Sequence, residues 1–491
     1  MSQNIVVAYQ NEKFKNHIKY TFDLIFSTLG IPWKFISYEQ LRNITLFSNS
    51  LIISYGKEKP KVDPFNHIHI YESNLFGSNY LKIHSLPKIP LPRYKNIPII
   101  YQGNGDLSDW VIFRANEFGK KIIETNIDII ASSFFMVTRY EEIIVKEKDR
   151  FNRFPAKASI AYKENFLDRP IVNEYIDLLW SWIKWFNLGF VRKHFWGNKK
   201  FALCLTCDVD SVLKYRSSYL LFRYIAKALL KHVSPKNAFL TLKDFLETKT
   251  KQKKDPYDTF DYMLSKMRKF GFKGSFYFIS GGRTRYEKRY SLNDSHVQHL
   301  INKIQNEGHE IGLHGSFDSY NNFSLMKKEK ENLEKILKKN IFGIRQHYLR
   351  WKTPNTWQVQ EKAGFKYDTT LYFAERAGFR AGFCLPYKPF DVLENRVLNI
   401  WELPLTIMEG TFQGYQKFSP EKAFYHMKNL IDTVKKHKGV VVILWHNSSF
   451  DNLGGWKGWS YVYEELLQYL SENDPLSDTC YNIVCKYESN I

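Results

Sequence analysis

The residues that could do hydrolytic chemistry gather in short segments of the second half of the chain. His314 and Asp318 stand four residues apart, a spacing at which two side chains can grip one metal ion across one turn. Asp208 and Asp210 share one face if the chain there is extended. Two carboxylates so close need a cation to stay ionised together. A divalent metal would let one act as ligand and the other as base, whereas a plain strand-end turn is the alternative.

Other short apolar runs in this half also end in polar residues. Helical stretches separate most of the runs, and this alternation predicts a parallel sheet or barrel. In such barrels the chemistry sits at the carboxyl ends of the strands. The expected strands are 201–206, 274–279, 310–313, 341–345, 366–371, 397–405 and 440–445. The ionisable residues that close runs are Asp208, Asp210, His314, Arg345, Asp368, Glu409 and His446.

The first half has no recognisable catalytic set. Strands are expected at 4–8, 51–55 and 67–71, and helices at 14–29, 128–141 and 172–186. His67 and His69 fall on one strand face; a metal role is open, but a structural role is favoured. A polar turn at 197–200 marks the boundary. We therefore expect a smaller α/β domain over 1–195 and a (β/α) barrel over 196–491.

Composition bounds the class of protein. The 491 residues are 44% hydrophobic and 16% aromatic, enough for sizeable cores. The formal net charge of +21 would suit nucleic acid, anionic lipid or an anionic glycan. The lysines are spread widely and no nucleic-acid motif accompanies them, so a residue usage set by the source genome is the favoured explanation and nucleic acid is not an expected partner.

The N-terminus and the cysteines indicate a reducing compartment. The N-terminus lacks the features of a signal peptide, and five sparse cysteines suggest free thiols.

The apolar segment 175–191 is too short and too charged to span a bilayer. A Lys-rich insert at 212–254, with a helix expected at 219–232, could be a lid, a membrane-surface patch or a solvated excursion. We expect a cytoplasmic protein, with peripheral contact to the inner membrane as an option.

These segments together resemble the polysaccharide deacetylase family, carbohydrate esterase family 4. Its members carry the motifs T-F-D-D-G, G-H-E-I-G-N-H-[ST]-x-x-H, R-x-P-x-G and a final L-x-H. This chain has, in the same order, Thr206-Cys-Asp-Val-Asp210, Gly308-His-Glu-Ile-Gly-Leu-His314, Arg345-Gln-His-Tyr-Leu349 and Ile443-Leu-Trp-His446. The first half resembles, more weakly, an uncharacterised domain that precedes this one in bacterial envelope-glycan proteins, through Phe135, residues 139–142, 153–154 and 161–163.

The resemblance implies a distorted (β/α) barrel of about seven strands and a metal held by one Asp and two His. Asp208 matches the general base and His314 the first ligand His. The family's metal Asp falls on Val209, so Asp210 has to take that role. The second ligand His is replaced by Asp318. His347, at the family's Pro position, is a possible substitute ligand. The expected ion is zinc, with cobalt, nickel or manganese as alternatives.

The remaining matches concern the base and the acid. Arg345 matches the Arg that orients the base, and His446 matches the general acid. An acidic partner should keep His446 protonated; we favour Asp368 over Glu409. Trp351, Trp445 and Tyr372 are aromatic residues that could stack on sugar rings.

The resemblance implies a hydrolase of carbon–nitrogen amide bonds. Its substrate would be an N-acetylated cell-envelope or capsular polysaccharide, or a lipid-linked precursor. In that mechanism a metal-bound water attacks the acetamide, with an Asp as base and a His as acid. The alternative is a catalytically silent glycan-binding or scaffold module of the same fold. Sequence does not fix the oligomeric state.

Overall fold

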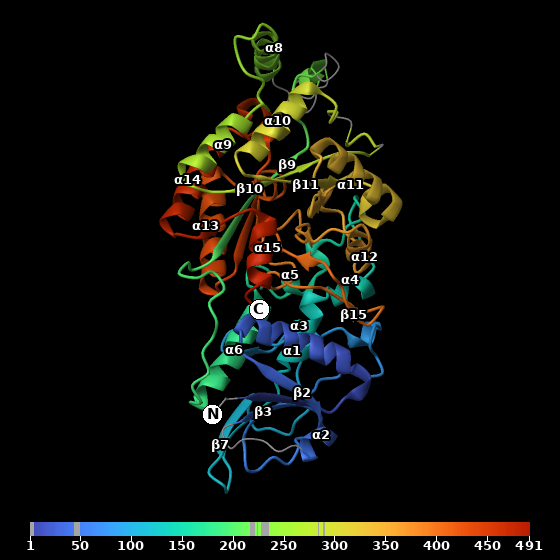
Figure 1. Ribbon diagram of the computed structural model, residues 1–491, viewed down its shortest axis with the longest axis vertical. Helices are drawn as coiled ribbons and strands as arrows, with labels where there is room; N and C mark the ends of the chain where they lie inside the picture. Colours follow the sequence, from blue (N-terminus) through green and yellow to red (C-terminus); the bar gives the residue numbers. More distant parts are fainter. Residues whose placement is uncertain are drawn as a thin grey trace.

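The computed structural model describes residues 4–43, 50–216, 221–222, 224–226, 235–282, 284–287 and 290–491. It is elongated and contains two large sheets, the first near the lower end of the long axis and the second above the middle (Figure 1). Every strand of the first sheet precedes residue 126 and every strand of the second follows residue 201. The predicted helix 219–232 lies mostly outside the described residues, and α8 (Pro235–Lys249) follows it.

The first sheet has the strand order β2-β1-β3-β4-β8-β7 and is parallel except for β7. Its central strands β1 and β3 are buried along their whole length because α1, α3 and α6 cover the face toward the second sheet (Figure 1), while Leu41 of α2 and Val62 pack on the other face. Ser54 contacts both His67 and His69 there. The strands are β1 (Ile5–Tyr9), β2 (Trp33–Ser37), β3 (Leu51–Gly56), β4 (Asn66–Tyr71), β7 (Val111–Ala115) and β8 (Lys121–Thr125).

Helices of the first half follow the predicted apolar spacing with one break. The expected helix 128–141 starts where Asp128 caps the backbone amide of Ala131, but ends early because Arg139 adopts a left-handed backbone (φ 54°). Two short hairpins, β5 (Arg93–Tyr94) with β6 (Ile97–Pro98) and β14 (Phe390–Asp391) with β15 (Arg396–Val397), lie outside the large sheets. The helices are α1 (Lys15–Leu29), α2 (Tyr38–Asn43), α3 (Ile129–Val137), α4 (Tyr140–Ile144), α5 (Ile160–Lys163) and α6 (Ile171–Trp185).

The second sheet is parallel and curls back on itself. Its order is β16-β13-β12-β11-β10-β9-β18-β17, with β19 (Leu476–Ser477) paired to the start of β9. The two edge strands are separated in sequence by residues 403–406 alone, and the curled sheet forms a half-barrel. The strands are β9 (Ala202–Val209), β10 (Gly274–Phe278), β11 (Glu310–Gly315), β12 (Gly343–Gln346), β13 (Tyr367–Asp368), β16 (Trp401–Glu402), β17 (Ile407–Met408) and β18 (Val440–Leu444).

Helices surround this curled sheet, in keeping with the predicted strand–helix alternation (Figure 1). The expected strand 366–371 is shorter than predicted, because Asp368 accepts a hydrogen bond from the Thr370 amide and turns the chain. Across the described ranges, no helix has the length and apolar character that crossing a membrane needs. The helices are α9 (Phe260–Lys269), α10 (Ser295–Asn306), α11 (Phe323–Leu337), α12 (Asn355–Lys362), α13 (Pro420–Lys436), α14 (Trp459–Glu472) and α15 (Cys480–Glu488).

A buried ion cluster joins the two halves. Glu142 accepts hydrogen bonds from Arg139 at 2.9 Å and from two nitrogens of Arg380, each at 2.8 Å. Burial opposes ionisation of Glu142, but Arg380 and Arg139 outweigh it and lower its pKa to about 2. Close by, Gly378 (φ 137°) lies against the Leu167 carbonyl, where a Cβ would come within 2.2 Å. The halves are therefore packed through specific polar contacts.

Replacing Glu142 by Gln should destabilise the protein by about 3–5 kcal/mol, because the buried Arg380 loses its carboxylate and the buried Arg139 keeps only Glu141. Urea unfolding followed by circular dichroism measures this. The folded-state pKa lies below the ordinary 4.5, so the stabilisation is present above that pH and lost as pH falls toward 2. The difference between variant and parent should thus shrink on acidification.

The matched control is Glu331→Gln, which removes a carboxylate from an exposed pair with Lys327 and should cost at most about 1 kcal/mol. Equal unfolding midpoints for the two variants would show that the cluster does not hold the halves together.

Candidate active site

A cavity of about 240 Å³ opens where the carboxyl ends of four parallel strands meet. Asp208 and Asp210 lie at the end of β9, and His314 lies in β11. His347 directly follows β12, and His446 is the second residue after β18. The pairing of adjacent parallel strands brings these ends to one edge of the sheet. Strand ends, separated by up to 238 residues in sequence, thus supply one site.

Three of these side chains converge in a way that suits a metal ion. Asp210 Oδ1 lies 3.3 Å from His314 Nε2 and 3.3 Å from His347 Nε2. A tetrahedral ion with ligands about 2.1 Å away has its ligand atoms about 3.4 Å apart. One carboxylate and two imidazoles are also a donor set typical of zinc and related ions. Among the described residues this is the group of three that could hold a metal.

The backbone and a carboxylate aim both imidazoles at this point. His314 Nδ1 lies 3.0 Å from the carbonyl oxygen of Arg345, which can only accept, so Nδ1 carries the proton and Nε2 offers its lone pair. His347 Nδ1 lies 3.5 Å from Glu287 Oε1. Burial opposes ionisation of Glu287, but His347 and Thr284 outweigh it and lower its pKa to about 2. Glu287 therefore orients the imidazole of His347, as the Arg345 carbonyl orients the imidazole of His314.

An uncommon backbone conformation presents His347 to the cavity. The next two residues, Tyr348 and Leu349, both have left-handed backbones, with φ of 60° and 51°. Such residues cost free energy and persist where surrounding contacts hold them. Arg153 of the first half supplies one such contact, because its Nη1 donates a hydrogen bond to the Tyr348 carbonyl at 2.7 Å. The ring of Phe151 packs on Tyr348 with centroids 4.9 Å apart. The first half thus supports a site residue of the second.

Asp208 is fixed by Arg345. Nη1 of Arg345 donates to Asp208 Oδ1 at 3.0 Å and to Thr206 Oγ1 at 2.7 Å, and Nε donates to the Thr369 carbonyl at 2.9 Å. The other oxygen of Asp208, Oδ2, lies 3.8 Å from His314 Nε2. The carboxylate is thus oriented by a buried guanidinium and turned toward the Asp210–His314–His347 group.

His446 faces the same cavity and is paired with Glu409. His446 Nδ1 lies 2.7 Å from Glu409 Oε1, which leaves Nε2 on the cavity side. Burial lowers the pKa of His446, but the charge and hydrogen bond of the fully buried Glu409 outweigh it and raise the pKa to about 10. His446 is consequently set up as a proton donor.

The structure places two predicted site residues elsewhere. The side chain of Asp318 is 60% exposed and pairs with Arg350 at 2.9 Å, because the chain turns into a 3₁₀ helix after it. His347, and not Asp318, is the third residue of the group that could hold a metal. Asp368 is buried and bonded to Gln360 and Thr370, so Glu409 is the partner of His446.

Sequence reasoning also missed residues that lie outside the expected strands and helices. Glu287 belongs to the connection between β10 and α10, where no strand end or motif singles it out. The aromatic residues picked for stacking, Trp351, Trp445 and Tyr372, are each 1% exposed. Tyr415, 42% exposed, lines the cavity instead. It is the last residue of a short π-helical segment, Thr411–Tyr415, and gave no signal in the sequence.

Comparison with known proteins gives partial similarity. A family of unknown function, DUF7033, matches residues 6–187. No curated protein matches the chain. A Mycobacterium smegmatis structure assigned as a polysaccharide deacetylase is 18% identical, with a TM-score of 0.40, over 59% of this chain and 91% of its own. Agd3, a carbohydrate deacetylase, is 9% identical (TM-score 0.37) over 99% of this chain and 87% of its own.

A third structure is BA3943 from Bacillus anthracis, a carbohydrate esterase family 4 pseudoenzyme. It is 11% identical, with a TM-score of 0.29, over 58% of this chain and 66% of its own. Active and inactive proteins thus both appear among the similar structures.

Loss of His347 should abolish tight metal binding, whereas loss of Asp318 should not. Titration of metal-free protein with Co²⁺, followed by visible absorption, should show about one ion per chain for the parent and for Asp318→Ala. Glu287→Gln should weaken binding about 10–100-fold, as loss of a ligand's partner does. His347→Ala should weaken it more. Tight binding by His347→Ala together with weak binding by Asp318→Ala would make Asp318 the ligand.

Proposed function

We propose that this protein is a metal-dependent hydrolase that removes acetyl groups from an N-acetylated glycan. One observation carries the proposal: a single cavity combines an Asp–His–His group, a carboxylate aimed by a buried arginine, and an imidazole paired with a buried carboxylate. Amide hydrolysis needs three such groups: a Lewis acid that polarises the carbonyl, a base for the attacking water, and an acid for the leaving nitrogen.

Each element has a separate role. Asp208, held by Arg345, accepts a proton from the attacking water. A divalent ion bound by Asp210, His314 and His347 would polarise the acetamide carbonyl and make water more acidic. His446 delivers a proton from Nε2 to the amide nitrogen as the C–N bond breaks. The new C–O bond gives acetate, and the sugar leaves as an amine.

The donor set and the surroundings narrow the cofactor and the substrate. One carboxylate with two imidazoles suits zinc and also cobalt, nickel or manganese. The cavity has room for one sugar-sized group. The motif order at Asp208, His314, Arg345 and His446 supports an envelope or capsular polysaccharide, or its precursor, as substrate.

Acetate should be released from N-acetylated oligosaccharides by the zinc- or cobalt-loaded protein, and a chelator should stop the release. Asp208→Asn should lower kcat about 10²–10⁴-fold, because the base is lost while the shape is kept. Acetate can be followed by an enzyme-coupled assay, with Asp318→Asn as the control that should stay active. Chelator-insensitive release would overturn the mechanism, and glycan binding without release by any metal form would favour a silent binding module.

Glu409→Gln should move the alkaline limb of the pH profile of kcat/KM to lower pH by at least about one unit. His446 acts only when protonated, and Glu409 raises its pKa above the ordinary 6.5, so activity persists below the raised pKa and falls as pH rises through it. Gln can still accept from Nδ1, so orientation is kept while the charge is lost. Glu331→Gln is the control. An unmoved limb with unchanged kcat would remove His446 from the role of acid.

A further inference from the structure

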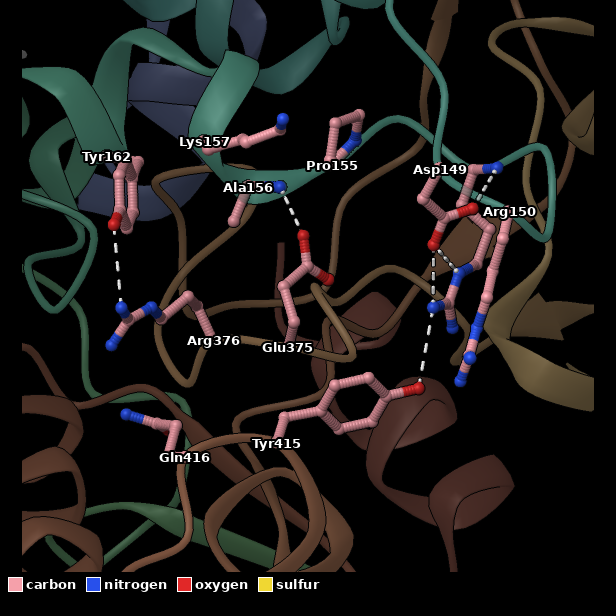
Figure 2. Close-up of a pocket in the computed structure, with 11 residues that line it drawn as sticks. Asp149, Arg150, Pro155, Ala156, Lys157, Tyr162, Glu375, Arg376, Tyr415 and Gln416 are labelled. Carbon is pink, nitrogen blue, oxygen red and sulfur yellow. Dashed lines mark hydrogen bonds and ion pairs between the residues drawn. The ribbon is translucent and has the colours of Figure 1, made fainter.

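A second and larger cavity lies beside the site. It measures about 720 Å³ and is lined by residues 149–162 of the first half and residues 375–416 of the second (Figure 2). We call it the junction cavity. Its first-half wall lies inside the stretch that matches the family of unknown function.

The junction cavity adjoins the site through a shared wall. Arg153 and Tyr415 line both cavities, and Arg153 Nη2 lies 3.5 Å from Tyr415 Oη. Arg153 is buried and held by Asp149, whereas Tyr415 is 42% exposed and presents its ring. A chain-like ligand with one unit in the site would therefore place its next units in the junction cavity.

The lining of this cavity carries surplus positive charge. Its cations are Arg150, Arg153, Lys157 and Arg376, and its carboxylates are Asp149, which pairs with Arg153, and Glu375, which accepts a hydrogen bond from the backbone amide of Ala156 at 2.5 Å. Arg150 and Arg376 are exposed, and Figure 2 shows them on either side of Glu375 and Tyr415. Lys157 is also exposed, but it pairs with Glu147 at 3.1 Å, so Arg150 and Arg376 supply the positive charge that a ligand can meet. A guanidinium is suited to bind carboxylate or phosphate oxygens in pairs.

We propose that the junction cavity binds the sugar units that flank the N-acetylated unit, and that it selects glycans bearing carboxylate or phosphate groups. Arg150 and Arg376 contact the anionic groups, and the ring of Tyr415 packs on a sugar face. This inference rests on the proposed function, since it takes the ligand to be the substrate glycan. The first half then has a direct part in substrate binding, because residues 149–162 build one wall of the substrate site.

The test is a binding measurement on metal-free protein, so that it does not depend on turnover. Calorimetry would compare three probes of similar length: a hyaluronan hexasaccharide, which carries carboxylates, an oligomer of N-acetylglucosamine 1-phosphate, and neutral chitohexaose. We expect at least one anionic probe to bind about tenfold or more tightly than chitohexaose. Preference for the first assigns carboxylate, and preference for the second assigns phosphate. Equal affinity for all three probes overturns the proposal.

Arg150→Gln/Arg376→Gln should remove that preference and leave chitohexaose binding unchanged. The control Arg268→Gln/Arg396→Gln removes the same charge from exposed pairs with Glu307 and Glu361 that line neither cavity, and it should bind like the parent. Tyr415→Ala should weaken binding of all three probes. If the arginine variant keeps the preference, or the control loses it equally, the junction cavity is not the anion site.

Acetate release is measured separately. Its absence would remove the proposed function while the binding preference stands, and a missing preference would remove this inference while deacetylation stands.

Discussion

The pairing of Asp208 with Arg345 is the interaction on which the site depends. Both side chains are almost completely buried, so neither charge could be kept there without the other. The same guanidinium bonds Thr206 on β9 and Thr369 just after β13, and its own backbone carbonyl fixes His314. Arg345 therefore sets the relative positions of Asp208, the imidazole of His314 and three strand ends. Its fork of donors can satisfy all these partners at once, which a lysine could not.

The second dependence runs between the halves of the chain. Glu142, held by Arg139 and Arg380, anchors the first half to the barrel by a buried ion cluster. Arg153 then reaches from the anchored segment to the carbonyl of Tyr348, next to His347. The left-handed backbone at Tyr348 and Leu349, next to His347, is thus stabilised by a residue from outside the second sheet. For this reason the first half is part of the site's construction, and a barrel separated from it would lose both this contact and one wall of the junction cavity.

Sequence was informative where chemistry sits on regular structure. Strand ends could be located from apolar runs, and Asp208, Asp210, His314, Arg345 and His446 do line or border one cavity, because parallel pairing dictates that arrangement. Loops were a different matter. Asp318 follows His314 at ligand spacing, but the chain bends it toward solvent. Glu287 contacts His347 from a loop, and Tyr415 reaches both cavities from the end of the short helical segment Thr411–Tyr415; the placement of both depends on tertiary contacts. The choice between Asp368 and Glu409 likewise depended on side-chain packing that periodicity does not encode.

The two departures from the deacetylase motifs compensate for each other in space. In the motif pattern the ligand carboxylate would fall on Val209 and the second imidazole on position 318. Here the carboxylate is one residue further along, at Asp210, and the imidazole comes from the next strand, at His347. Their atoms nevertheless meet at 3.3 Å, the same distance that separates Asp210 from His314. A shared ion would favour this convergence, and so does the attraction of the Asp210 carboxylate for the two imidazoles. Glu287 reaches His347 from yet another loop and lies 3.5 Å from its Nδ1, the nitrogen that does not face Asp210, which is the place of the carboxylate that commonly orients a ligand histidine.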